Sequence, residues 1–202
     1  MDRVFARFLE QLGKPIDRYE VPESSIERYR GKLPDLLLEY WAEHGWCGYG
    51  DGIFWIVNPQ DYEGVVASWI GNTELEKHDS YHVIARSAFG DLYLWGERTG
   101  FSLKIISFLS RCVIDDFEPT PEQMDRKVQD FLLSIDAESN DYDDLFNSAR
   151  KKLGPLRHDE LYGFVPALIF GGPDTLDHLE KLKAVEHLIF LSQLAELEPY
   201  DF

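Results

Sequence analysis

The residues best suited to chemistry in this chain are its histidines, and their spacing supports no familiar catalytic site. Of the six histidines, only His78 and His82 stand at the H-x-x-x-H spacing that binds zinc from one helix face, and the segment HDSYH lacks the glutamate of the H-E-x-x-H zinc motif. His82 has no serine or cysteine elbow of the G-x-S-x-G type nearby, so it has no visible nucleophile to activate. We therefore expect no catalytic residue, no metal ligand and no cofactor-binding residue, and we predict that the protein is not an enzyme.

Neighbouring carboxylates and a glycine-rich turn are the other candidates for chemistry. The pairs Asp115-Asp116 and Asp143-Asp144 would suit acid/base or divalent-metal work, but their polar neighbours indicate open solvent, where carboxylates gain little catalytic power. Residues 48–52 (GYGDG) superficially resemble a phosphate-binding loop. They precede a predicted strand and lack both a helix N-terminus and the P-loop lysine, so a simple turn is favoured.

The charge of the chain restricts its partners. The 202 residues carry 37 acids and 20 bases, for a net charge of -17. Direct binding to nucleic acid or to an anionic membrane surface is disfavoured, because both reward positive charge. Residues 115–144 hold eleven of the acids and only two bases. This segment is either a solvated linker with wet helix faces or a docking patch for a cationic partner.

Cysteine usage and the N-terminus favour a reducing compartment. Only Cys47 and Cys112 are present, far apart and without C-x-x-C spacing, so neither a disulfide framework nor a zinc knuckle is indicated. The first residues lack the uninterrupted apolar core and the cleavage site of a secretory signal. The longest uncharged runs are too short to span a bilayer. We predict a cytoplasmic protein that does not enter the membrane.

The elements of the N-terminal part are predicted to be helices around a small antiparallel sheet. Apolar spacing of three and four residues predicts helices over residues 1–12, 24–31, 34–45 and 62–69. Strands are expected where apolar and β-branched residues lie between turn signals, with short connections that imply antiparallel pairing. These strands are residues 53–57, 81–87, 91–95, 101–107 and 111–114.

The C-terminal part is predicted to be entirely helical, which makes the fold class α+β. Thr120, Pro121 and Gln123 supply an N-cap, a proline at the first position and a capping-box acceptor for a helix through Ile135. Further helices are expected over residues 142–153 and 176–197. Residues 162–173 (YGFVPALIFGGP) are almost entirely apolar and contain Pro166. We expect them to be buried and irregular or briefly helical, and not a central strand.

Long, distinctive stretches in both halves carry a family resemblance. In the first half they are YRGKLPDLLLEYWAEHGWCGYGDGIFWIVNPQDY (residues 29–62) and YHVIARSAFGDLYLWGE (residues 81–97). In the second half they are DLFNSARKKLGPLRHDELYGFVPALIFGG (residues 144–172) and EKLKAVEHLIFLSQLAE. Together they resemble bacterial proteins that join an N-terminal GAD-like domain to a C-terminal immunity-type domain. The resemblance implies a GAD-like domain over residues 1–116 and a helical immunity-type domain over residues 117–202, packed against the first.

The resemblance also implies a function. Members of this family resemble the cognate immunity proteins encoded beside type VI secretion effectors, particularly DNase toxins, which they bind and silence without catalysis. A DNase needs a basic groove, so an acidic face would be steered to it and would cover it. The candidate partner-binding residues on such a face are Asp115, Asp116, Glu118, Asp141, Asp143 and Asp144.

Three alternatives stay open at this point. A competing contact surface uses Tyr49, Asp51 and Trp55 near the glycine-rich turn, in which case inhibition is allosteric or deforms the active site of the toxin. A second function class is a small metal-dependent hydrolase that uses clustered carboxylates, for which a divalent ion would raise thermal stability. A third is a general regulatory or scaffold module with several partners.

Overall fold

A single large sheet organises the protein, in a computed structural model that describes residues 2–115 and 117–200. Its strand order is β1-β2-β3-β4-β5-β6-β7-β10, and every neighbouring pair is antiparallel except β7 and β10, which are parallel. The strands are β1 (Ile16–Tyr19), β2 (Trp46–Tyr49), β3 (Phe54–Ile56), β4 (Tyr81–Ser87), β5 (Asp91–Gly96), β6 (Gly100–Ile106), β7 (Arg111–Ile114) and β10 (Glu198–Pro199). The predicted meander is confirmed by β4 to β7.

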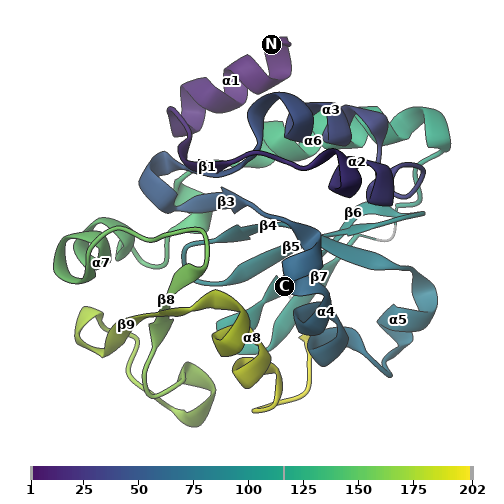
Figure 1. Cartoon of the computed structure of the whole chain (residues 1–202). Helices are drawn as coiled ribbons and strands as arrows, with labels where there is room; N and C mark the ends of the chain where they lie inside the picture. Colours follow the sequence, from purple (N-terminus) through teal and green to yellow (C-terminus); the bar gives the residue numbers. More distant parts are fainter. Residues whose placement is uncertain (1, 116, 201–202) are drawn as a thin grey trace.

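Helices cover both faces of this sheet, as Figure 1 shows. One face carries α1 (Arg3–Leu12), α2 (Glu23–Tyr29), α3 (Asp35–His44) and α6 (Met124–Ser134), with α6 packed against α1, α3 and β6. The other face carries α4 (Glu63–Ile70) and α8 (Ala184–Ser192), which pack against each other. Two further helices are α5 (Glu74–His78) and α7 (Phe146–Leu153). None of the helices in the described residues has the length and apolar character needed to cross a membrane.

The core on the α6 side is a cluster of aromatic rings. Phe131 of α6 lies 4.8 Å from Phe101, 5.8 Å from Tyr93 and 6.3 Å from Phe54, measured between ring centroids. Phe8 of α1 approaches the same cluster, with its ring 6.0 Å from that of Phe54. The capping box predicted at Thr120 is present and starts a 3₁₀ turn that leads into α6. A helix from the C-terminal part therefore completes the core of the N-terminal sheet.

The predicted all-helical C-terminal part is wrong, and so is the small, purely antiparallel sheet. The main sheet has eight strands, the last of them from the C-terminal end, and a second sheet pairs β8 (Glu160–Phe164) with β9 (Leu179–Lys183). The predicted helix over residues 176–197 shrinks to α8, because its first half pairs with β8. The amide of Tyr162 in β8 donates to the carbonyl of Ala88 at 2.9 Å, which ties the small sheet to the large one.

The C-terminal part is thus divided between the two faces of the large sheet. Helix α6 lies on one face, α8 lies on the other and β10 joins the edge beside β7. Residues that precede position 116 and residues that follow it therefore pack together in one continuous core. The division into domains at that residue stays a prediction.

Candidate functional site

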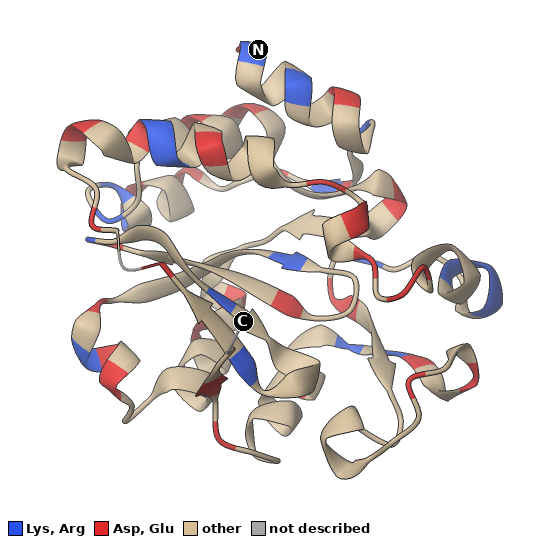
Figure 2. Ribbon diagram, turned by 180° about the vertical axis from the view of Figure 1, so that it is seen from behind, with Lys and Arg blue, Asp and Glu red and all other residues tan. Residues whose placement is uncertain are grey.

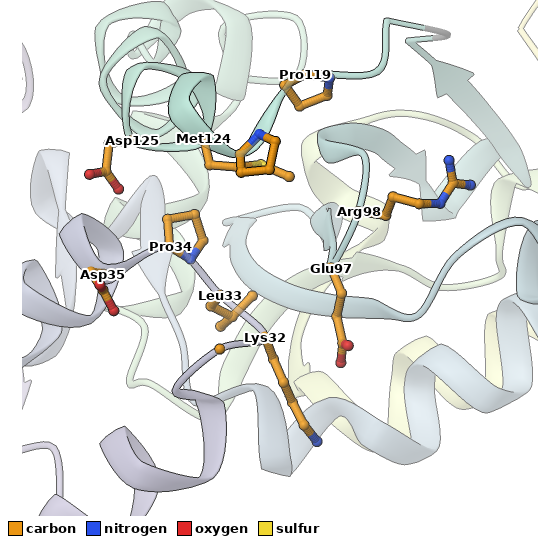
Figure 3. A pocket seen from close by; sticks show the side chains of 11 residues that line it. Lys32, Leu33, Pro34, Asp35, Glu97, Arg98, Pro119, Met124 and Asp125 are labelled. Atoms are coloured by element: carbon orange, nitrogen blue, oxygen red, sulfur yellow. The ribbon is translucent and has the colours of Figure 1, made fainter.

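The largest hollow that we describe lies where the two parts of the chain meet. Figure 3 shows this pocket, which has a volume of about 590 Å³. Its walls come from residues 31–35 ahead of α3, from Glu97 and Arg98 in the β5–β6 turn, and from Pro119, Pro121, Met124 and Asp125 at the start of α6. Apolar side chains such as Leu33 and Pro34 lie between the charged ones.

The charged side chains of this pocket are largely used for structure. Arg98 forms an ion pair with Glu118 and donates to the carbonyl of His78 at 2.8 Å. Asp125 accepts a hydrogen bond from the amide of Leu36 at 3.3 Å and so caps the first turn of α3. The lining residues in the described part of the chain include no serine, cysteine or histidine. Nor do the described residues hold a group of three or more His, Cys, Asp or Glu placed to bind a metal ion. The pocket is a gap where three segments of the chain pack together, and its lining offers no nucleophile with an activating base.

Two of the candidate partner-binding residues from the glycine-rich region are inside the protein. Tyr49 and Trp55 are completely buried. The Tyr49 hydroxyl contacts the Cys47 thiol at 3.1 Å, and the Trp55 indole N–H donates to the carbonyl of Gly52 at 2.8 Å. Asp51 is exposed and forms an ion pair of 3.6 Å with Arg150 of α7. Of these three residues, only Asp51 has surface to offer to a partner in this structure.

The acidic candidates fall into two groups at opposite ends of α6. The helix between them, α6, has 11 residues and is about 16 Å long. At the first end, Asp115 contacts Lys127 at 3.1 Å and Glu118 pairs with Arg98, so both carry less uncompensated charge than expected. Asp116 lies outside the described residues. Figure 2 shows Asp and Glu spread over helices and loops around the molecule, with no single acidic element.

At the other end of α6, Asp141, Asp143 and Asp144 form an acidic turn (residues 141–144). Asp141 accepts from the amide of Phe146 at 2.8 Å and caps α7, and burial raises the pKa of its carboxyl group. Asp143 and Asp144 are exposed and both have positive φ angles, 48° and 57°. They take part in no ion pair among the residues described. Among the acidic candidates, these two carboxylates are the ones whose charge no described cation compensates.

A further surface was missed by the sequence interpretation. The connection between β8 and β9 was expected to be buried, yet it exposes Val165, Ile169 and Phe170. The signal that would have found it is the absence of any charged residue from Leu161 to Pro173. Such a run fits a buried strand, which β8 is, followed by an apolar loop that faces solvent.

Comparisons with known proteins agree with the resemblance read from the sequence. Residues 3–109 match the family model of the GAD-like domain. Residues 125–195 match the model described as T6SS immunity protein Tdi1, C-terminal. No curated protein matches the chain. Among solved structures, the crystal structure of Atu4351 from Agrobacterium tumefaciens is similar, with 25% identity and a TM-score of 0.87 over 98% of this chain and 92% of that one.

Proposed function

Because the chain belongs to the GAD-like domain family and also carries the C-terminal region of a T6SS immunity protein, we propose that it neutralises a DNase effector of a type VI secretion system. It does so by binding the toxin in the cytoplasm and blocking its active site, with no bond made or broken. The observation that carries the immunity role is the match of residues 125–195 to the Tdi1 model.

The charge of the protein supports a DNA-cleaving target. A DNase must hold a polyanion, so its substrate groove is basic, and a protein of net charge -17 is attracted to such a groove. Attraction between opposite charges accelerates association, which favours a protein that must capture a toxin before the toxin finds DNA.

The exposed acids with free charge are the best candidates for this steering. Asp143 and Asp144 are retained as contact candidates, whereas Asp115 and Glu118 already face Lys127 and Arg98. Asp51 also stays a contact candidate, although its charge is partly compensated by the ion pair with Arg150 of α7. Covering the groove and deforming the active site both remain compatible with contacts at these positions.

The proposed function is tested with the toxin domain of the effector encoded beside this protein. Co-expression is expected to restore growth to cells that produce the toxin domain, and added protein is expected to stop plasmid cleavage in vitro. Because inhibition is by binding, complete inhibition should require about one molecule of this protein per toxin molecule. No rescue, or full inactivation of the toxin by a small fraction of an equivalent, would contradict the proposal. In the second case this protein would be acting as a catalyst on the toxin.

A further inference from the structure

An apolar loop (residues 165–173) projects from the small sheet. It connects β8 to β9 and contains the 3₁₀ turn η6 (Leu168–Phe170). Phe170 is 66% exposed, the highest fraction among the large apolar side chains that we describe. The amides of Phe170 and Gly171 donate to the carbonyls of Ala167 and Leu168, so the loop has a defined shape. In Figure 1 this hairpin lies at the opposite end of the molecule from α1.

Neighbouring elements extend the exposed apolar surface. The turn η3 (Ser107–Leu109) contacts both η6 and α8, and it exposes Leu109. Phe190 of α8 is exposed as well. An apolar surface built from three separate elements differs from isolated apolar side chains, which are common on any protein. Contiguous patches of this kind usually mark a site of interaction with another macromolecule.

The acidic turn borders this apolar surface. The Tyr142 ring lies 5.2 Å from that of Phe108 in η3 and 5.1 Å from that of Phe164 in β8, between centroids. Its hydroxyl is 3.5 Å from Asp174, directly after the apolar loop. Tyr142 thus joins the loop to Asp143 and Asp144. The carboxylates of Asp143, Asp144 and Asp174 form no ion pair within the described part of the chain. Their partners in a complex would be cations.

We propose that the apolar loop, bordered by Asp143, Asp144 and Asp174, is the surface that docks the cognate toxin. Phe170 is the anchor at its centre, and the acids pair with lysines or arginines around an apolar patch on the toxin. This combination of an apolar centre and a charged rim is typical of protein interfaces. The proposal rests on the proposed function, and it gives that function a location. The loop and its acidic rim both lie within the residues that match the immunity model.

The test measures the affinity of a catalytically inactive toxin domain for the full-length protein and its variants. Phe170→Ser is expected to weaken binding at least about tenfold, because it removes a central aromatic anchor. The double variant Asp143→Asn, Asp144→Asn removes two charges, and asparagine tolerates the positive φ angles at both positions. It is expected to slow association at low salt at least about threefold.

Matched controls lie on α3 and α6, which cover the face of the large sheet opposite α8. Leu133→Ser changes an exposed leucine of α6, and Asp35→Asn with Glu39→Gln removes two exposed charges of α3. Both controls are expected to bind like the wild type, and all variants should unfold at the same urea concentration.

If wild type binds tightly and Phe170→Ser binds equally tightly, the docking surface is overturned while the proposed function stands. If wild type itself fails to bind the toxin domain, the proposed function falls as well. Self-association through the loop, seen as a dimer in wild type that Phe170→Ser abolishes without weakening toxin binding, would also overturn the docking proposal.

Discussion

Replacing Arg86 with methionine is expected to lower the free energy of unfolding by about 3–5 kcal/mol. Arg86 is completely buried on β4 and stacks over Trp55, with its guanidinium carbon 5.2 Å from the ring centroid. It forms no ion pair with the carboxylates that we describe, and its partners are neutral oxygens. They are the Tyr62 hydroxyl and the backbone carbonyls of Ser87, Arg157, His158 and Glu160.

The size of this effect follows from the acceptors that the substitution leaves behind. Methionine fills much of the same volume but donates nothing, so all five oxygens lose a hydrogen bond at once. Three of these oxygens belong to residues 157–160, which lead into β8 and include its first residue, so Arg86 also holds the small sheet against the large one. Urea unfolding measures the loss, with Arg126→Met on the exposed surface of α6 as the control. A loss below about 1 kcal/mol would show that the guanidinium network contributes little.

Replacing Phe131 with alanine is expected to cost about 3–5 kcal/mol, the usual range for a buried aromatic residue. Phe131 is 3% exposed and contacts rings from β3, β5 and β6. If the segment after residue 116 were only a solvated linker with a wet helix, the substitution would have little effect. The prediction therefore tests whether α6 belongs to the core of the N-terminal sheet.

The control for Phe131 is a leucine on the solvent-exposed face of the same helix. Leu133 is 42% exposed, and Leu133→Ala is expected to change the free energy of unfolding by less than about 1 kcal/mol. Equal effects of the two substitutions in urea unfolding would contradict the packing described for α6. A single cooperative transition in wild type is the expected background for both measurements.

The meander within the large sheet was predictable because its signals are local. Strands β4 to β7 alternate with short turns, and each turn brings the next strand back beside the last. The Thr120 capping box was readable for the same reason, since all its partners lie within four residues. Local patterns of this kind need no knowledge of the rest of the fold.

The C-terminal part could not be read in this way, because its strands depend on distant partners. Residues 179–183 (LEKLK) have good helix formers, and only pairing with β8 makes them a strand. β10 has two residues and exists because the chain passes beside β7. Tertiary contacts of this kind override local propensity.

The candidate site was predictable in composition but not in position. The acidic excess of residues 115–144 is visible in the sequence, whereas its division by α6 is not. The ion pair of Glu118 with Arg98 joins residues from different elements, and no spacing rule foresees it. Likewise, an aromatic residue such as Trp55 can be an anchor or a core residue, and only the fold decides between them.

Hydrogen exchange of this protein with and without the inactive toxin domain tests the central claim most directly. Amides of the acidic turn (residues 141–144) and of the apolar loop (residues 165–173) are expected to exchange more slowly in the complex. Amides around the pocket at residues 31–35 are expected to keep their exchange rates. Protection confined to that pocket, or no protection anywhere at saturating toxin, would contradict neutralisation by docking on the apolar loop and the acidic turn.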